Sequence, residues 1–444
     1  MKFDIFDYLK NGRYRPKNLI ESIVTQFLNL FYIKRSKNFS FHILWYKSSP
    51  NSSNYYNKFG RFVILISNFL SVILFNKLLI KGIGLGEDIY VKSNKGNNNF
   101  CWPELKNLNY NNIGLKNIDE IKKKIDSQYL YSKKIKVKSD LLFWKKNREL
   151  FEKNFFDKNG NVIQESLINF RNSKIEFSSN LLLNNNIENL KTRLNKLKAL
   201  RIFIMYHKVA ELVDEDIIIN ITDNNIGNAS FIHYRKQIIN ERLLRQGYFL
   251  SQIRKYAKLD ERNVNIFCDI GPGYGMLPSI MRKEFNFSKF ILVDLPELNI
   301  LSYYFLKNLF PESKICLSYE IENEKVINKE LINKYDFMIL EQNDLKKLED
   351  KVVDCTINTA SLGEMSKADQ DYYINQIERL TKKYFYSVNR HRSDNIHFSS
   401  TEGYYDFQLN NEIWKTRLYN FSPTFHIEAL LEKKINLKNI CKDY

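Results

Sequence analysis

The second half of the 444-residue chain alternates short apolar runs with stretches whose apolar residues recur at helical spacing. Each run is bounded by turn residues and has the length of a buried strand rather than that of a helix. The spacing predicts helices over 238–256, directly before the first run, and over 367–380. Strands that alternate with helices in this way predict an α/β fold, with a parallel sheet covered on both faces. The expected strands are 264–268, 290–293, 337–340, 355–357 and 384–388.

The first half of the chain has a different pattern. Amphipathic stretches such as 19–33 and 141–156 are separated by polar runs. We expect a mainly helical N-terminal region over 1–200, a helical lead-in or lid over 201–257, and the α/β domain over 258–444.

One segment of the N-terminal region, 62–80, is strongly apolar and has basic residues on both flanks. It is interrupted by Asn68, Asn76 and Lys77, so its uninterrupted part is shorter than the roughly 20 residues that a membrane span needs. We expect a buried or interfacial helix here. A core helix is one interpretation, and peripheral attachment to an anionic membrane is the other.

Composition bears on partners and compartment more than on the fold. With 68 Lys and Arg against 50 Asp and Glu, the net charge is +18, and it is carried by scattered lysines. Lysine usage of this kind is typical of an AT-rich genome, and it also suits an acidic partner such as a nucleotide-linked sugar, an anionic lipid surface or nucleic acid. The five cysteines show no C-x-x-C spacing, and the N-terminus shows no signal-peptide pattern. We expect a reduced, cytoplasmic protein without a metal site, peripheral at the inner membrane face if 62–80 is interfacial.

The most informative motif is the heptapeptide Asp-Ile-Gly-Pro-Gly-Tyr-Gly, which follows the first expected strand and precedes a helix-compatible stretch. Glycines at alternate positions allow a tight turn and let a ligand approach the backbone. A dinucleotide fingerprint would place its third glycine or alanine at Met276, so the spacing argues against that cofactor. An acid at the strand end can accept hydrogen bonds from a ligand amine or hydroxyl. The candidate cofactor residues are Asp269, Gly271, Gly273 and Gly275.

A second acid follows the second expected strand. Asp294 lies 25 positions after Asp269 (294 minus 269) and precedes Leu295. In a doubly wound sheet, an acid at about this distance lies at the carboxyl end of the neighbouring strand, where it can hold both ribose hydroxyls. Taken alone, it could equally be a helix N-cap. Together with the glycine loop, it predicts that Asp294 and Leu295 contact the cofactor.

Polar residues also follow the strand 355–357, in the sequence Asn-Thr-Ala-Ser-Leu-Gly-Glu-Met that begins at Asn358. Together with DIGPGYG, LVDLPE and YFYSVNR, this segment resembles a family of sugar O-methyltransferases encoded with bacterial surface-polysaccharide genes. The glycine loop itself resembles motif I of the class I S-adenosylmethionine (SAM)-dependent methyltransferases. The resemblance covers roughly 226–392. Its hallmark element matches here at Asn358, Thr359, Ser361, Glu364 and Met365.

The resemblance implies a Rossmann-like domain with a mostly parallel, seven-stranded sheet that ends in antiparallel strands, which we expect around 414–419 and 425–427. It implies SAM as the cofactor and a hydroxyl of a sugar in surface polysaccharide, or in a nucleotide- or lipid-linked precursor, as the acceptor. It places Asn358 beside the cofactor and places Thr359, Ser361 and Glu364 beside the substrate.

Transfer of a methyl group to a hydroxyl is an in-line displacement that must remove the hydroxyl proton, and this needs a general base or a metal. Glu364 and His391 are the candidate catalytic residues, and Asp394 and His397 are nearby alternatives. Arg390 could bind a phosphate of the substrate through its forked donors. The competing interpretations are a core histidine, a solvated arginine, and Glu364 as the cap of the helix 367–380.

Adenine recognition is assigned to Asn343, in the polar segment 341–344 that follows the third expected strand. His233 and Tyr234 could lie over the cofactor as part of a lid. An ordinary polar loop and core aromatic residues are the respective alternatives.

The alternatives to this function are a DNA methyltransferase, an RNA or other small-molecule methyltransferase, and a non-catalytic scaffold. A DNA methyltransferase is disfavoured, because no N/D-P-P-Y tetrapeptide stands at 358–361. An RNA or other small-molecule methyltransferase stays open, although the basic residues are dispersed and no specific nucleic acid is expected. A non-catalytic scaffold of a glycan assembly complex stays open as well, although an intact glycine loop argues for catalysis.

Overall fold

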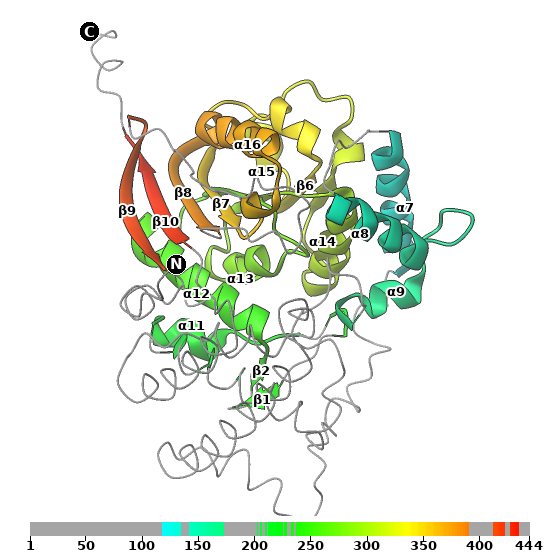
Figure 1. The fold of residues 1–444 in the computed structure, drawn as a ribbon, viewed down its shortest axis with the longest axis horizontal. Coiled ribbons are helices and arrows are strands. Elements are labelled where there is room, and N and C mark those ends of the chain that lie inside the picture. The colour runs from blue at the N-terminus through cyan, green and yellow to red at the C-terminus, as the bar shows by residue number, and fades with distance from the viewer. Residues whose placement is uncertain are drawn as a thin grey trace, which may run out of the picture.

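The computed structural model describes residues 118–134, 142–172, 241–389, 412–421 and 427–434, together with parts of 202–240. Its centre is an eight-stranded sheet with the order β5-β6-β4-β3-β7-β8-β10-β9 (Figure 1). The first six strands in this order are parallel to their neighbours, whereas β10 is antiparallel to both β8 and β9. The strands are β3 (Ile266–Ile270), β4 (Lys289–Val293), β5 (Ile315–Leu317), β6 (Phe337–Leu340), β7 (Val353–Thr359), β8 (Thr381–Asn389), β9 (Trp414–Phe421) and β10 (Ile427–Lys433).

This sheet confirms the expected Rossmann-like α/β class: the parallel strands are followed by β10, which is antiparallel to both of its neighbours. The sheet has eight strands rather than seven. The additional strand, β5, pairs only with β6 at the sheet edge and has three residues, too few for an apolar run to stand out in the sequence. The last strand spans 427–433 rather than 425–427.

Helices cover both faces of the sheet. One buried cluster joins the sheet to α12 (Glu241–Ala257), α13 (Met276–Glu284) and α14 (Pro296–Leu309). The second cluster joins the other face to α15 (Lys329–Asn333) and α16 (Lys367–Leu380). Three short 3₁₀ segments lie in the connections, namely η3 (Ser318–Ile321), η4 (Gln342–Lys347) and η5 (Leu362–Glu364).

The helix expected over 238–256 starts at Glu241 instead. Asn240 is its N-cap, because its side-chain oxygen accepts a hydrogen bond from the Leu243 N–H at 2.9 Å. The residues before it form β2 (Gln237–Ile239), which pairs with β1 (Ile232–Tyr234). α16 begins and ends where the sequence predicts.

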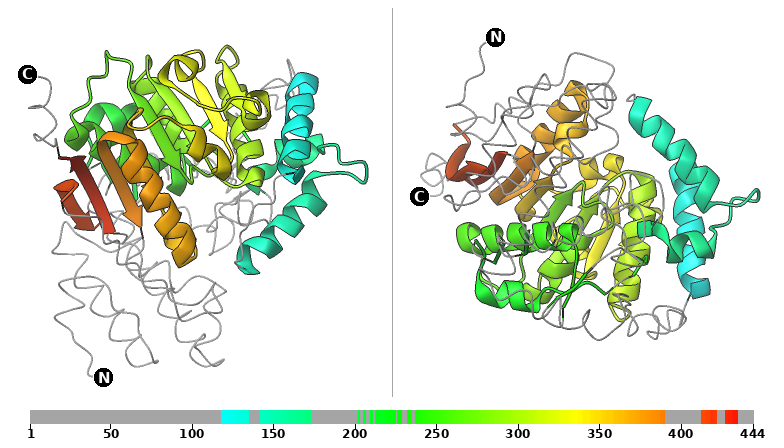
Figure 2. Two further views of the ribbon diagram at one scale, coloured as in Figure 1. Left: turned by 90° about the horizontal axis from the view of Figure 1, so that it is seen from above. Right: turned by 60° about the horizontal axis from the view of Figure 1, so that its bottom comes forward.

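The described N-terminal helices pack against this domain. They are α7 (Ile118–Lys134), α8 (Leu142–Phe155), α9 (Gln164–Ile168), η2 (Phe170–Asn172) and α11 (Glu215–Asn220). Figures 1 and 2 show α7 beside α14, and apolar residues of α7, α8 and α9 belong to the same buried cluster as those of α14. The described part of the N-terminal region therefore shares a core with the sheet.

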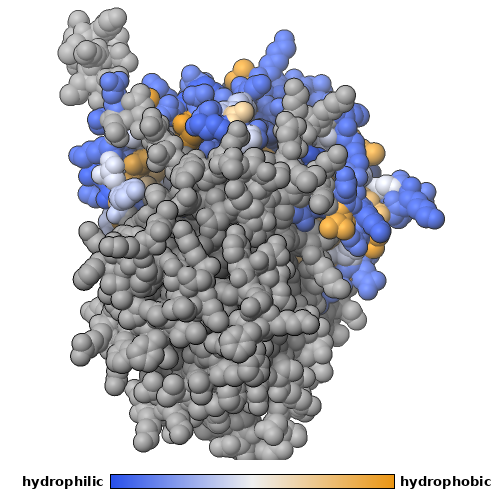
Figure 3. Space-filling model, in the orientation of Figure 1, coloured by the Kyte–Doolittle hydropathy of each residue, from blue (hydrophilic) through white to orange (hydrophobic). Residues whose placement is uncertain are grey.

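The described surface has few apolar groups on the face seen in Figure 3, where hydrophilic residues predominate among the coloured atoms. Within the described ranges, we find no helix with the length and apolarity that a membrane crossing requires. The apolar segment 62–80 and the expected helix 19–33 lie outside those ranges.

Candidate functional site

The expected site residues that follow β3, β4 and β7 lie together at the carboxyl ends of these strands. The glycine loop leaves β3, and the Gly271 N–H donates to the Val293 carbonyl of β4 at 2.8 Å. On the other side, the Ser361 hydroxyl beyond β7 donates to the Ile270 carbonyl at 3.0 Å. Three segments separated by up to 91 positions in the chain therefore form one sheet edge. Such an edge is where open α/β sheets bind ligands.

All three loop glycines have left-handed backbone conformations, with φ of +80° at Gly271, +63° at Gly273 and +86° at Gly275. A Cβ at Gly271 would lie 2.1 Å from the Ser361 hydroxyl oxygen, and one at Gly275 would lie 3.3 Å from Leu306. Among the described residues, a Cβ at Gly273 would make only an ordinary contact, at 3.6 Å from the Arg242 Nη1. Packing within the protein therefore explains the first and third glycines, whereas at the second only the end of one flexible side chain lies near the Cβ position.

Asp294 is held by the backbone around it. Its Oδ2 accepts from the Gly273 N–H at 2.9 Å, and its Oδ1 accepts from the Leu295 N–H at 2.7 Å. Each carboxylate oxygen keeps a further lone pair, so the group can still accept from both hydroxyls of a diol. Burial raises the pKa of Asp294 to about 7, although the two backbone hydrogen bonds oppose this shift.

Asp269 is an unsatisfied group of the site. The residue is 3% exposed, and within the described part of the chain neither of its carboxylate oxygens has a hydrogen-bond partner. Burial, followed by the charge of Asp294, raises the pKa of Asp269 well above its usual range. A buried carboxyl group without partners is costly, so a ligand with an amine or a hydroxyl would complete it.

Asn358 and Ser361 form a hydrogen-bonded corner behind the glycine loop. The Asn358 Nδ2 donates to the Ile270 carbonyl at 2.6 Å and to the Ser361 hydroxyl at 2.5 Å. Its Oδ1 accepts from the Leu362 N–H and from the Nδ2 of Asn389, the latter at 2.8 Å. The amide of Asn358 is thus fully used within the sheet edge, and contact of Asn358 or Ser361 with a ligand stays a prediction. The sequence reading missed Asn389, whose Oδ1 also accepts from the Gly363 N–H.

Thr359 and Glu364 lie at the same edge, and both are partly buried. The Glu364 N–H donates to the Ser361 carbonyl at 2.8 Å. Glu364 does not cap α16: the cap is Ser366, whose hydroxyl accepts from the Asp369 N–H. His391, Arg390, Asp394 and His397 lie outside the described residues, so their roles stay predictions.

In the segment 341–344, which is expected to recognise adenine, the buried residue is Glu341 and not Asn343. Asn343 is exposed on η4, whereas Glu341 is 1% exposed and one of its oxygens has no partner. Its other oxygen accepts from Gln128 at 2.8 Å and from Ser132 at 2.6 Å, both on α7. Burial raises the pKa of Glu341 to about 7. These contacts bridge more than 200 positions, so sequence spacing could not reveal them.

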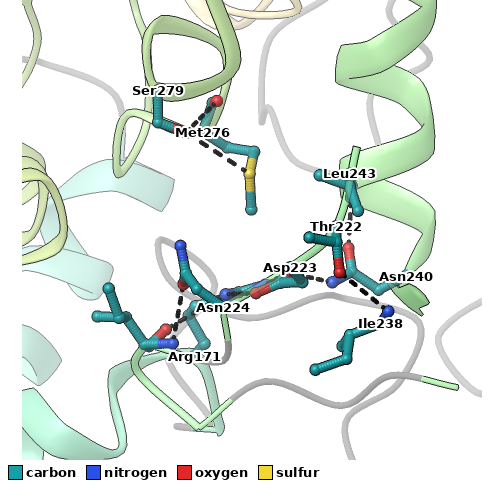
Figure 4. A network of polar contacts seen from close by, with 10 residues as sticks. Arg171, Thr222, Asp223, Asn224, Ile238, Asn240, Leu243, Met276 and Ser279 are labelled. Atoms are coloured by element: carbon teal, nitrogen blue, oxygen red, sulfur yellow. Dashed lines mark hydrogen bonds and ion pairs between the residues drawn. The ribbon is translucent and has the colours of Figure 1, made fainter. Parts of the chain in front are cut away.

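A buried ion pair lies next to the glycine loop (Figure 4). The Arg171 guanidinium donates to both oxygens of Asp223, at 2.9 and 2.6 Å, and Asn240 donates to the same carboxylate. The Arg171 guanidinium also lies 5.0 Å from the ring centroid of Tyr274, the residue between the last two glycines of the loop. The N-terminal segment, the start of α12 and the glycine loop are thereby connected. Backbone pairing places His233 in β1, but its side chain lies outside the described atoms.

Comparison with known proteins gives solved structures with a similar fold. No protein-family model matches the chain, and no curated protein matches its sequence. A SAM-dependent methyltransferase from Aquifex aeolicus is 13% identical with a TM-score of 0.30, over 42% of this chain and 89% of that one. The magnesium protoporphyrin IX methyltransferase ChlM from Synechocystis PCC 6803, with bound S-adenosylhomocysteine (SAH), is 11% identical with a TM-score of 0.29, over 44% of this chain and 89% of that one.

The mitomycin 7-O-methyltransferase MmcR is 12% identical with a TM-score of 0.29, over 44% of this chain and 57% of that one. All three TM-scores lie below 0.5, so these likenesses carry no weight for function. The proposed function therefore rests on the geometry of the sheet edge.

Proposed function

We propose that this protein is a SAM-dependent O-methyltransferase that acts on a hydroxyl of a sugar, in surface polysaccharide or in a nucleotide- or lipid-linked precursor. The observation that carries the cofactor assignment is the arrangement around Gly273. Without a side chain, this glycine lets a ligand approach its backbone, and its N–H positions Asp294. Within the described residues, both carboxylate oxygens of Asp269 near the end of β3 are unpartnered.

These residues fit the groups that SAM carries. The buried Asp269 would accept from an ammonium group, because a paired charge removes the cost of a buried carboxylate. Asp294 would accept from both ribose hydroxyls through its two remaining lone pairs. When bound, SAM supplies an electrophilic methyl group on a sulfonium. The contribution of the protein is to hold the acceptor hydroxyl in line with that group and to remove its proton.

The acceptor assignment rests on the β7 edge. Thr359, Ser361 and Glu364 follow the strand that adjoins the glycine loop, and they match the hallmark of the family that the sequence resembles. Glu364 is partly buried at this edge and carries the carboxylate that would take the hydroxyl proton, with His391 as the second candidate base. Arg390 would bind an anionic part of the substrate.

The first experiment is titration calorimetry of the full chain with SAM and with SAH. We expect binding of both ligands, and the absence of binding would overturn the proposal. The second experiment measures methyl transfer from SAM to sugar nucleotides, glycan extracts and bulk RNA. Transfer to the sugar-containing acceptors supports the proposal, whereas transfer to RNA alone would overturn the sugar assignment and keep the cofactor assignment.

A further inference from the structure

The first turns of α12 carry two arginines that the proposed function leaves without a role. Arg242 and Arg245 are three positions apart, so they lie on the same side of the helix. Both are partly buried. Within the described part of the chain, neither guanidinium forms an ion pair with a carboxylate, in contrast to Arg254 further along the helix, which pairs with Asp216 at 2.6 Å.

Arg242 lies directly over the glycine loop. Among the described residues outside the loop itself, its Nη1 is the atom that a Cβ built on Gly273 would contact, at 3.6 Å. Its guanidinium lies 4.9 Å from the ring centroid of Tyr274. This placement puts a positive charge beside Gly273 and Tyr274 of the glycine loop.

Arg245 lies one turn further along the helix and is more strongly enclosed. Its Nε is buried and has no hydrogen-bond partner. Burial, followed by the charge of Arg242, lowers the pKa of Arg245 to about 10, while Glu241, Tyr274 and Glu364 act in the opposite direction. Two neighbouring guanidinium groups with an unsatisfied, buried donor are unfavourable unless an anion joins them.

A second unsatisfied donor belongs to the same place. Tyr274 is 1% exposed, and its hydroxyl has no hydrogen-bond partner among the described residues. Its ring contacts Arg242. Unpartnered donors of two residue types, with a positive charge on each arginine, favour an anionic ligand over a neutral one.

We infer that Arg242 and Arg245 form an anion-binding site for an acidic group of the methyl acceptor, a phosphate or a carboxylate. This inference rests on the proposed function and adds a substrate class to it. Two guanidinium groups can bind one phosphate through forked pairs of hydrogen bonds. Arg245 interacts electrostatically with Glu364 of the predicted acceptor edge, so the anion would be held between the glycine loop and that edge.

The carboxylate of SAM is the other anion that could occupy this site, and the test separates the two. Inorganic phosphate is titrated calorimetrically into the full chain, first alone and then with saturating SAH, which carries the same carboxylate as SAM. We expect phosphate to bind in both cases with similar affinity. We also expect Arg245→Met and Arg242→Gln to weaken phosphate binding tenfold or more, while SAH affinity changes less than threefold.

Arg262→Gln is the matched control, because Arg262 is exposed in the turn after α12 and its loss changes the net charge equally. It should leave phosphate binding unchanged. Arg245→Lys retains the charge but lacks the fork, and we expect it to restore part of the phosphate affinity. Thermal melts identify any variant that fails to fold, and Arg242→Gln, at the more open position, then carries the test.

Three results would overturn the inference. In the first, phosphate does not bind the wild-type chain. In the second, SAH abolishes phosphate binding and both arginine variants weaken SAH instead, which assigns the site to the cofactor carboxylate. In the third, Arg262→Gln is as harmful as the site variants. If wild-type protein binds phosphate through these arginines but does not bind SAH, the proposed function fails, and with it the assignment of the anion to a methyl acceptor.

Discussion

At the scale of one residue, Asp294 shows how a carboxylate is oriented before a ligand binds. Two backbone N–H groups, from Gly273 and Leu295, orient its carboxylate, and burial keeps its pKa at about 7. A ligand that donates hydrogen bonds to the ionised form would gain from this orientation, because the direction of the acceptor atoms is already set.

The raised pKa of Asp294 predicts a pH dependence of cofactor binding. Its carboxyl group ionises as the pH rises through about 7, so SAH affinity should increase from pH 6 to pH 8, by up to about tenfold per unit below the pKa. The raised pKa of Asp269 acts in the same direction. Asp294→Asn should bind SAH about ten- to a hundredfold more weakly and lose the midpoint near 7, as measured by calorimetry at several pH values.

The raised pKa of Asp294 has the opposite effect on the ligand-free protein, whose stability decreases as the pH rises. A carboxyl group whose pKa is raised by folding is stabilising while protonated, and that stability is lost as the pH rises from the ordinary aspartate value through about 7.

The binding experiment assigns the titration to Asp294. An unchanged midpoint for SAH binding in Asp294→Asn would contradict this assignment. Asp216→Asn is the control, because it removes an exposed carboxylate, the partner of Arg254, instead of a buried one.

Gly273→Arg should abolish SAH binding, because the new side chain would enter the space beside the loop and add a positive charge next to Arg242. Calorimetry measures the binding, and circular dichroism checks the fold. Gly160→Arg is the matched control: Gly160 also has a left-handed backbone, with φ of +80°, but no atom lies within 4 Å of its Cβ position. Both variants carry the same backbone strain, so retained binding in Gly273→Arg would show that the cofactor lies elsewhere.

At the scale of elements, the Arg171–Asp223 pair joins η2 to the segment that leads into α12. Both side chains are buried, and Asn240, the N-cap of α12, donates to the same carboxylate. Gly227 allows the close approach of these segments, since a Cβ there would lie 2.2 Å from Phe170. The pair therefore couples the N-terminal region to the helix that carries Arg242 and Arg245.

Arg171→Met should lower the free energy of unfolding by about 3–5 kcal/mol, because it leaves Asp223 buried and without its counter-charge. Urea denaturation followed by circular dichroism measures the loss. Lys133→Met is the control, since Lys133 pairs with Glu152 on the exposed surface, where a pair contributes at most about 1 kcal/mol. Equal losses in the two variants would argue against the proposed coupling.

At the scale of the whole molecule, the site draws on the sheet, α12 and the N-terminal helices within one buried cluster. Cofactor binding should therefore stabilise this body as a unit. At a SAH concentration of about 100 times Kd, linkage predicts roughly 2.7 kcal/mol of added stability, which raises Tm by about 5–10 °C. Scanning calorimetry measures this shift. If SAH raised only the Tm of a minor unfolding transition, the site would belong to a unit that unfolds separately.

Attachment to a membrane also belongs to this scale, and it stays a prediction. The chain has a net charge of +18, and the apolar segment 62–80 has basic flanks. If that segment is interfacial, the full chain should sediment with vesicles of anionic lipid at low salt, and replacement of Leu65 and Leu70 by Asp should abolish this. Binding that is equally strong in the variant would assign the attraction to the remaining positive charge.

The features that depend on local order in the chain could be predicted from the sequence. The alternation of strands and helices, the glycine loop with its acid, and Asp294 at the next strand end all follow from patterns within about 25 residues. Backbone geometry is local: a strand length, a turn that needs glycine and an N-cap are set by neighbours in the chain. The bounds of α16 and the existence of β3, β4, β6, β7 and β8 were therefore predictable.

Contacts between distant parts of the chain became known from the folded structure alone. It showed that Gly271 makes room for Ser361, that Glu341 is held by α7, and that Arg242 lies over Gly273. These contacts join residues from 31 to 213 positions apart, and no periodicity or motif spacing encodes such pairs. Burial, which sets the pKa of Asp269 and Asp294, likewise depends on the packing of several elements at once. The sequence thus predicted the glycine loop, and the tertiary structure decided which charges and hydrogen bonds surround it.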